Sequence, residues 1–401
     1  MICRLFVAIV LATEVLAQEV RTPPPSPSQH AGIGQTDGDG RLLHLVAFSN
    51  KIIRESCVSM ETALLAGWTY NLVTTFTAAN ASRAGANGEK TLKLYALKDF
   101  LASQHVHDQD IVLFADAYDV VFQGTATSFV ASVMGDRRRV PWDVRTTLVF
   151  NAEDFCHPFI CCSASYRCPL TQGVEYLKRP NVNNTPYACE LQSARAHARA
   201  SSTLLHTVEK GVKRPIMFLN SGVSLGAVGI YRKFIDRALA MVATLPPLCH
   251  DDQGVVAWMY ARDPVPVTLD FASTVLATSQ VHVLKDYTFN NATGMWQHRN
   301  GASPFLIHFA GSKRAYAAYK KSVHNWHKRR LGGTAAIRAF LRNQTITIDG
   351  EQRPFFTVCP EEHTSLWSSF VQGVDLVLKR SGITKVRPPP EECPPEFCPR
   401  Y

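Results

Sequence analysis

Residues Ile111 to Val120 read IVLFADAYDV, an apolar run followed directly by two aspartates three positions apart. A short, fully apolar run predicts a strand buried on both faces, as in a parallel sheet. Ligands of open parallel sheets bind at the carboxyl ends of the strands. We therefore expect Asp116 and Asp119 to lie at a ligand-binding edge as hard oxygen ligands for Mg²⁺ or Mn²⁺. The alternative is a turn whose aspartates only cap backbone groups.

Strands and helices alternate on both sides of this segment. Apolar runs predict strands at residues 42–48, 70–76, 111–115, 147–151, 224–227, 265–269 and 305–309. Helical spacing of apolar residues predicts helices at residues 57–64, 94–101 and 234–242. Such alternation is typical of a parallel sheet built from right-handed crossovers, so we expect an α/β fold over residues 41–345.

The N-terminus has the layout of a cleaved signal peptide. A short basic start is followed by the apolar run Leu5–Val15 and by small residues before Gln18, which predicts a signal peptide at residues 1–17. The run is well short of the roughly 20 residues that a bilayer requires, and no later segment is apolar enough, so we expect no stable membrane span. Residues 18–40, rich in proline and then glycine, predict a flexible linker.

Cysteine usage indicates an oxidising compartment. Cleavage would leave ten cysteines, several of them clustered in a cysteine-rich insertion at residues 155–215 and others in a proline- and cysteine-containing C-terminal extension at residues 346–401. Their spacing lacks the paired C-x-x-C units of a zinc site, which favours disulfides. With sequons at Asn80, Asn183, Asn291 and Asn343, this predicts a glycoprotein of the secretory pathway lumen (endoplasmic reticulum or Golgi) or a secreted one.

A second segment, Pro304–Lys313, is another apolar strand that ends in polar residues. His308 at its end would complete a carboxylate-rich metal site, and a nitrogen ligand favours Mn²⁺ over Mg²⁺. Gly311 would allow the backbone close to a phosphate, and Lys313 would offset its charge. A single strand-end histidine is more often structural, but the earlier pair of aspartates makes a ligand role the better interpretation.

Two further segments carry polar groups between apolar ones. Asn220 lies in FLNSGV, residues 218–223, interpreted as a polar turn, and Asp251, Asp252 and Gln253 form an acidic turn that opens an apolar helix. A carboxylate there could orient a reacting hydroxyl or stabilise developing positive charge. One of the two aspartates could instead cap the helix that begins near Gly254.

An ordered set of four segments resembles the glycosyltransferase domain of the procollagen lysyl hydroxylase family and related collagen glycosyltransferases. The set is DAYDV at residues 116–120, FNAEDFCHP at 150–158, FLNSG at 218–222 and DDQ at 251–253. The segments HFAGSK at 308–313 and DQG at 252–254 also resemble motifs of glycogenin-like transferases. The resemblance covers roughly residues 41 to 320. It implies a GT-A fold, a Rossmann-like, mostly parallel sheet flanked by helices.

The resemblance also implies an activity and a site. It implies a hexosyltransferase that uses a UDP-sugar as donor and a protein or glycan acceptor, with Mn²⁺ (or Mg²⁺) held by Asp116, Asp119 and His308. The implied donor-binding residues, with Tyr118 near the uridine and Lys90 near the phosphates, are Phe48, Lys90, Tyr118, Gly311 and Lys313. The implied catalytic residues are Asp251, Asp252, Gln253 and Asn220.

Two other interpretations belong to different functional classes. One is a secreted protein that keeps the fold and binds a UDP-sugar or a glycan without turnover, and the other is a metal-dependent phosphohydrolase. The net charge of +9 suits an anionic ligand such as a nucleotide diphosphate, although many secreted proteins are basic for no ligand reason. The basic runs at residues 137–139 and 327–330 fit a solvated surface of a secreted chain, so we expect no nucleic-acid partner.

Overall fold

The predicted sheet is centred on three parallel strands. The computed structural model describes residues 35–37, 39–74, 91–135, 140–153, 218–244, 252–262, 265–278, 287–298, 301–310 and 313–364. Strand β2 (Leu42–Phe48) pairs in parallel with β3 (Tyr70–Val73) on one side and with β4 (Ile111–Asp116) on the other. Their nearly continuous apolar sequences suit strands that are buried on both faces.

The sheet extends from these strands in both directions. Among the described residues the strand order is β14-β13-β3-β2-β4-β7-β6-β8, with β1 (Gln35–Thr36) paired to β2. Strand β7 (Phe218–Ala227) runs antiparallel to both β4 and β6 (Leu148–Glu153), whereas β8 (Val267–Asp270) is parallel to β6. At the other edge β13 (Thr345–Ile348) is parallel to β3 and antiparallel to β14 (Glu351–Pro354).

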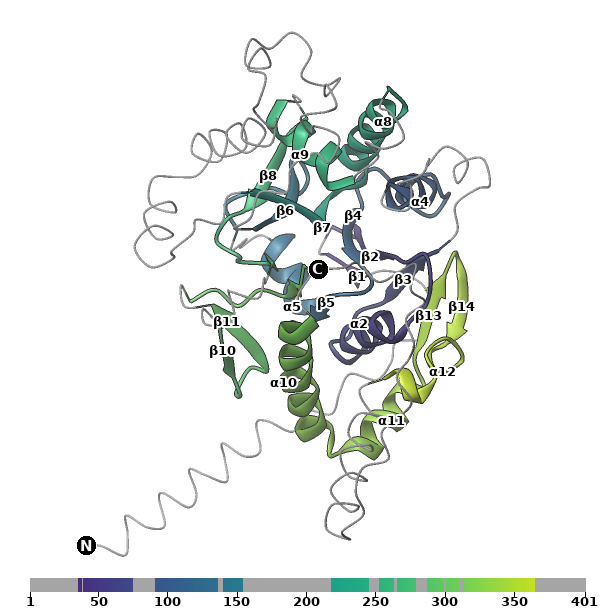
Figure 1. The fold of residues 1–401 in the computed structure, drawn as a ribbon, viewed down its shortest axis with the longest axis vertical. Helices are drawn as coiled ribbons and strands as arrows, with labels where there is room; N and C mark the ends of the chain where they lie inside the picture. The colour runs from purple at the N-terminus through teal and green to yellow at the C-terminus, as the bar shows by residue number, and fades with distance from the viewer. Residues whose placement is uncertain are drawn as a thin grey trace, which may run out of the picture. The chain divides into compact units, whose positions relative to one another are not determined.

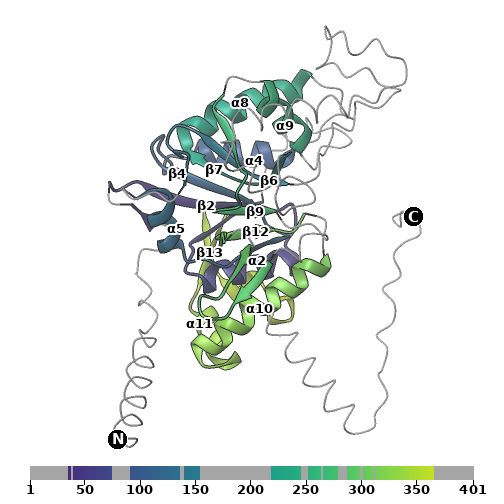
Figure 2. The ribbon, with the colours of Figure 1, turned by 90° about the vertical axis from the view of Figure 1, so that its left-hand side faces the viewer.

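Helices cover both faces of the sheet, as Figures 1 and 2 show. Alternate residues of β2, such as Val46, pack on one face with α4 (Leu92–Leu101), α8 (Val228–Thr244) and α9 (Asp252–Arg262). The residues between them, such as Leu45, pack on the opposite face with α2 (Arg54–Leu65), α5 (Ala126–Val133) and α11 (Thr334–Arg342). This alternation is the period of two that an extended strand imposes.

A small sheet packs beside the large one and carries the second predicted segment. Strand β12 (Leu306–His308) pairs antiparallel with β5 (Val120–Phe122) and parallel with β9 (Leu276–Thr278). Two further elements pack against this small sheet in one apolar cluster. They are the hairpin of β10 (Tyr287–Asn290) and β11 (Met295–His298) and the helix α10 (Lys313–Leu331).

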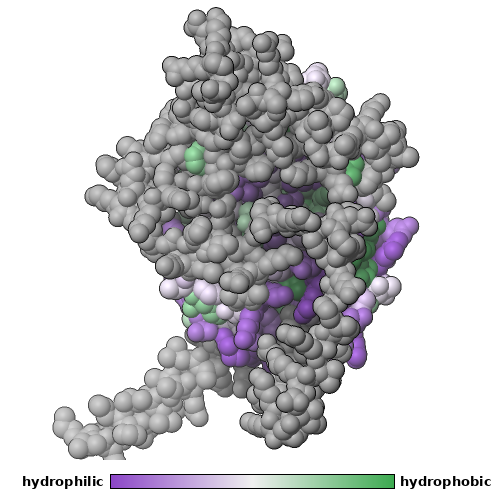
Figure 3. Space-filling view, viewed as in Figure 1, coloured by the Kyte–Doolittle hydropathy of each residue, from purple (hydrophilic) through white to green (hydrophobic). Residues whose placement is uncertain are grey.

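The C-terminal part of the described chain is joined to the core. Strands β13 and β14 are followed by the short helix α12 (Phe355–Val358) and a 3₁₀ turn (Glu361–His363). A disulfide links Cys57 of α2 to Cys359 across 302 positions. The hydrophilic surface at the right-hand edge of Figure 3 lies over β14, whose four residues are all exposed. No helix in the described ranges is long and apolar enough to cross a membrane.

The structure confirms the predicted fold class, an α/β fold with a mostly parallel sheet flanked by helices. One local prediction is wrong: residues 218–223 are not a turn but the first half of β7. Strand β13 crosses the predicted boundary at residue 345 and belongs to the large sheet. The predicted signal peptide, most of the linker, the cysteine-rich insertion and residues 365–401 lie outside the described residues.

Candidate functional site

The site is built where β4 ends and the small sheet begins. Asp116 is the last residue of β4, and Asp119 directly precedes Val120, the first residue of β5. In the antiparallel register of β5 and β12, His308 stands opposite Val120, and the amide of Phe309 donates to the carbonyl oxygen of Asp119 at 2.8 Å. The pairing of these two short strands therefore brings His308 to the loop that carries both aspartates.

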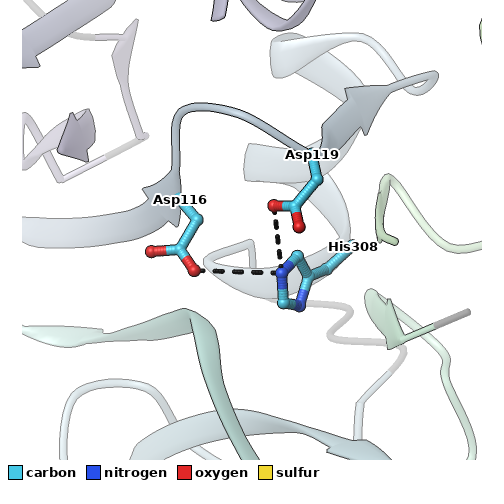
Figure 4. A group of neighbouring side chains, drawn as sticks. All are labelled: Asp116, Asp119 and His308. Carbon is cyan, nitrogen blue, oxygen red and sulfur yellow. Dashed lines mark ion pairs between the residues drawn. The ribbon is translucent and has the colours of Figure 1, made fainter. Parts of the chain in front are cut away.

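The three side chains converge on one point, as Figure 4 shows. The Nε2 atom of His308 lies 3.1 Å from Oδ1 of Asp119 and 3.8 Å from Oδ2 of Asp116. One ligand atom from each residue lies within 4.8 Å of the other two. His308 is 4% exposed, whereas both aspartates are partly exposed, so the cluster has a closed base and an open side. Two carboxylates and one imidazole form a donor set that could hold a metal ion.

Asn220 holds the imidazole of His308 in this orientation. The amide nitrogen of Asn220 donates to Oε2 of Glu153 at 3.0 Å, so its Oδ1 must accept, and it lies 2.8 Å from Nδ1 of His308. The hydrogen therefore sits on Nδ1, and Nε2 faces the carboxylates. Gly222 donates its amide to the same Oδ1 at 2.9 Å. A Cβ on Gly222 would lie 2.2 Å from the His308 ring, so this close approach requires glycine.

A buried lysine that was not predicted connects α9 to the group formed by Asp116, Asp119 and His308, which is called the metal cluster below as a candidate site. The Nζ atom of Lys93, on α4, lies 2.7 Å from Oδ2 of Asp252 and 3.2 Å from Oδ1 of Asp116. Ser221 donates its hydroxyl to the same Oδ2 of Asp252 at 2.6 Å. Burial lowers the pKa of Lys93, but the two carboxylates outweigh it and hold the pKa above its ordinary value, so the ammonium stays charged.

The same neighbours perturb the two metal-ligand candidates that are most buried. Burial raises the pKa of Asp116, and the positive charge of Lys93 only partly opposes this effect. Burial lowers the pKa of His308, but the carboxylate of Asp119 overcomes it, and the net shift is upward. Perturbed titratable groups that meet at one point are a frequent mark of a functional site.

The other predicted site residues differ in how far they are buried. Asp252 is 6% exposed and begins α9, and Gln253 beside it donates to Oε1 of Glu153 at 2.6 Å. Tyr118 is partly exposed, and its hydroxyl contacts the loop after β2, with Oγ of Ser49 at 2.9 Å. Phe48 is 7% exposed and packs in the core between the sheet and α4.

Three predicted residues cannot be placed. Lys90, Asp251 and Gly311 lie outside the described residues, and of Lys313 only its position as the first residue of α10 is described. Sequence reasoning missed Lys93 and gave no role to Glu153 or Ser221. Helical spacing gives no signal for Lys93, because it places Lys93 beside the buried Ala96 and Leu97 but equally places the exposed Lys98 beside the buried Leu94 and Leu101.

Comparisons with known proteins add structural neighbours. The sequence matches no protein-family model and no curated protein. Among solved structures, the galactosyltransferase LgtC in complex with donor and acceptor sugar analogues is similar at 12% identity and a TM-score of 0.35, over 71% of this chain and 94% of LgtC. An active-site mutant of LgtC is similar at 11% identity and a TM-score of 0.35, over 70% and 95%. The bifunctional glycosyltransferase WbbM is similar at 12% identity and a TM-score of 0.34, over 74% of this chain and 52% of WbbM.

Proposed function

We propose that this protein is a metal-dependent GT-A glycosyltransferase that transfers a hexose from a UDP-sugar to an acceptor hydroxyl on a protein, as on hydroxylysine, or on a glycan. The observation that carries the proposal is the convergence of Asp116, Asp119 and His308 at the carboxyl end of β4. We further propose that the protein works in the lumen of the secretory pathway or after secretion, as its N-terminus and cysteines suggest.

The donor set fits a divalent cation. Asn220 leaves Nε2 of His308 directed at both carboxylates, and Asp116, Asp119 and His308 would hold the ion with one ligand atom each. A Mn²⁺ or Mg²⁺ ion held there would act as a Lewis acid that offsets the charge of the departing diphosphate.

The surrounding residues hold this site in place. Lys93 neutralises part of the charge on Asp116 and fixes Asp252 at the start of α9. Asp252 and Asn220 are 6% and 2% exposed and are hydrogen-bonded within the protein, so we assign them to positioning rather than to direct contact with the acceptor. Gln253, which is partly exposed, stays with Asp251 as the proposed pair that faces the sugar and acceptor.

The donor would approach from the loops around the metal cluster. Tyr118, on the loop between the two aspartates, presents its ring near the segment after β2 and is our proposed contact for the uridine. The phosphate contacts that we propose are Lys90, Gly311 and Lys313. Phe48 is our proposed donor-binding residue at the end of β2, where its carbonyl oxygen accepts from the amide of Ala117, on the loop between the two aspartates, at 3.2 Å.

Product analysis with a panel of UDP-sugars tests the proposal. The full chain should release intact UDP from at least one of them in the presence of Mn²⁺ and not in the presence of a chelator. Asp119→Asn should abolish this release, whereas Asp236→Asn, which changes an exposed aspartate of α8, should not. Binding of UDP without any turnover would favour the binding-protein interpretation, and release of inorganic phosphate would favour a phosphohydrolase.

A further inference from the structure

A buried carboxylate at the end of β6 contacts two residues of the candidate site. Glu153 is the last residue of β6 and is 3% exposed. The first residues of β7 pair with this end of β6, and α9 packs against β7 (Figure 1). The two oxygens of Glu153 accept from the side-chain amides of Asn220, at 3.0 Å, and of Gln253, at 2.6 Å. One carboxylate therefore joins the residue that orients His308 to a residue that we propose to face the sugar.

Backbone groups settle how each of the two amides is turned. The backbone amide of Gly222 can only donate, and it lies 2.9 Å from Oδ1 of Asn220, so Nδ2 of Asn220 faces Glu153. The backbone carbonyl oxygen of Leu219 can only accept, and it lies 3.4 Å from Nε2 of Gln253, so this nitrogen faces Glu153 as well. Both oxygens of Glu153 therefore accept from N–H donors, as those of an ionised carboxylate do.

The two amides depend on Glu153 to different degrees. Asn220 has a second strong contact, with Gly222, that fixes the same orientation. For Gln253, the contact with Glu153 at 2.6 Å is far shorter than its other two described hydrogen bonds, which are 3.4 and 3.5 Å long. Gln253 is also partly exposed, whereas Asn220 is 2% exposed, so the side chain of Gln253 is freer to turn. Loss of the carboxylate should therefore change the orientation of Gln253 and not that of Asn220.

We propose that Glu153 is a positioning residue that fixes which end of the Gln253 amide a ligand meets. With its nitrogen held by Glu153, Gln253 keeps its carbonyl oxygen to accept from a ligand, and a sugar hydroxyl is a donor of this kind. This purpose rests on the proposed function, in which Gln253 faces the sugar and acceptor. The arrangement itself, a negative charge that makes two amides donate at once, does not depend on turnover.

Exchanging the two side chains tests the arrangement. Glu153→Gln replaces one carboxylate oxygen by an NH₂ group of nearly the same size. Because Asn220 still requires an acceptor, the new oxygen should turn to Asn220 and the new NH₂ group toward Gln253, where two donors would face each other. Gln253→Glu instead brings two carboxylates together at the 2.6 Å contact. In the double variant, the amide at position 153 again accepts from Asn220 and donates to the carboxylate at position 253, so both contacts are restored.

Urea unfolding of the full chain measures the arrangement without any turnover. Each single variant should raise the unfolding equilibrium constant about tenfold or more, and the double variant should return it to within about threefold of the wild type. The control is Glu351→Gln, which changes an exposed glutamate of β14 paired with Arg353 and should leave unfolding unchanged. Glu153→Gln without effect, or a double variant no more stable than Glu153→Gln, would overturn the proposal, so the result holds even if Gln253→Glu does not fold.

Turnover and metal binding show whether Glu153 acts on Gln253. In the UDP-release assay, Glu153→Gln should lower kcat/KM about tenfold or more, and the double variant should recover most of this loss. Calorimetric titration with Mn²⁺ alone should give the same affinity for the wild type and Glu153→Gln, because Asn220 keeps its contact with His308. A weaker Mn²⁺ affinity in Glu153→Gln, or a kcat/KM at the wild-type level, would refute the positioning role at Gln253. If the wild type neither binds Mn²⁺ nor releases UDP, the proposed function fails, and the unfolding experiment alone decides the arrangement.

Discussion

Replacing Lys93 with methionine tests whether the buried cation organises the site. Lys93→Met keeps the length of the side chain but removes the charge that lies 2.7 Å from Asp252 and 3.2 Å from Asp116. The side chain of Lys93 is 10% exposed and that of Asp252 is 8% exposed, so water cannot replace the lost partner. Breaking a buried ion pair in this way costs about 3–5 kcal/mol, so we expect the free energy of unfolding to fall by that amount.

The matched control lies on the same helix. Lys98 contacts Asp236 at 2.6 Å, but their side chains are 50% and 61% exposed, so Lys98→Met should cost no more than about 1 kcal/mol. Urea unfolding followed by circular dichroism at neutral pH measures both losses, provided that the slope with urea is unchanged. Adding Asp252→Asn to Lys93→Met should recover part of the loss, because it removes a buried charge without a partner. The reasoning is refuted if Lys93→Met and Lys98→Met cost the same.

Three further predictions follow from the site and the core. His308→Ala should reduce metal-supported turnover strongly and flatten any preference for Mn²⁺ over Mg²⁺, because the nitrogen ligand favours the softer ion. Titrations of activity with each metal measure this preference. An unchanged metal preference would show that His308 is not a ligand. His327, with its pKa lowered from 6.5 to about 3, stays neutral while the unfolded chain takes up a proton. The free energy of unfolding should therefore fall as the pH drops below about 6.5, by about 2 kcal/mol at pH 5, and this loss should be absent in His327→Phe. Cys57→Ser should cost about 2–5 kcal/mol in chemical unfolding, and mass spectrometry should find the Cys57–Cys359 pair in the non-reduced protein; free thiols at both positions would contradict the luminal assignment.

The parts of the structure that the sequence predicts are those with a strong local pattern. The buried strands β2 and β4 and the amphipathic helix α8 are long enough for their apolar spacing to be read directly. Strand β12 falls within the apolar run at residues 305–309, which predicts it, whereas β5 and β9, with three residues each, are made strands by pairing between distant segments rather than by local preference.

The site likewise combines residues that a local sequence pattern reveals with residues that only long-range pairing brings together. Asp116 and Asp119 are three positions apart on one loop, so their pattern is visible in the sequence. His308 lies far away along the chain and joins them only because β12 pairs with β5. Lys93 and Lys98 occupy the same helix, and only packing against the sheet decides that the first is buried and the second exposed.

The direction of β7 explains why a wrong local prediction still marked the right region. Residues 218–223 look like a turn because polar residues interrupt an apolar segment, yet they begin a strand that runs opposite to β4 and β6. In a sheet whose ligand edge lies at the carboxyl ends of the parallel strands, an antiparallel strand brings its first residues to that edge. Asn220 is thereby placed opposite Asn151, and Val223 opposite Ala115, next to the cluster. The polar residues of FLNSG are thus buried because they serve the site: Asn220 orients His308, Ser221 contacts Asp252, and Gly222 leaves room for the imidazole.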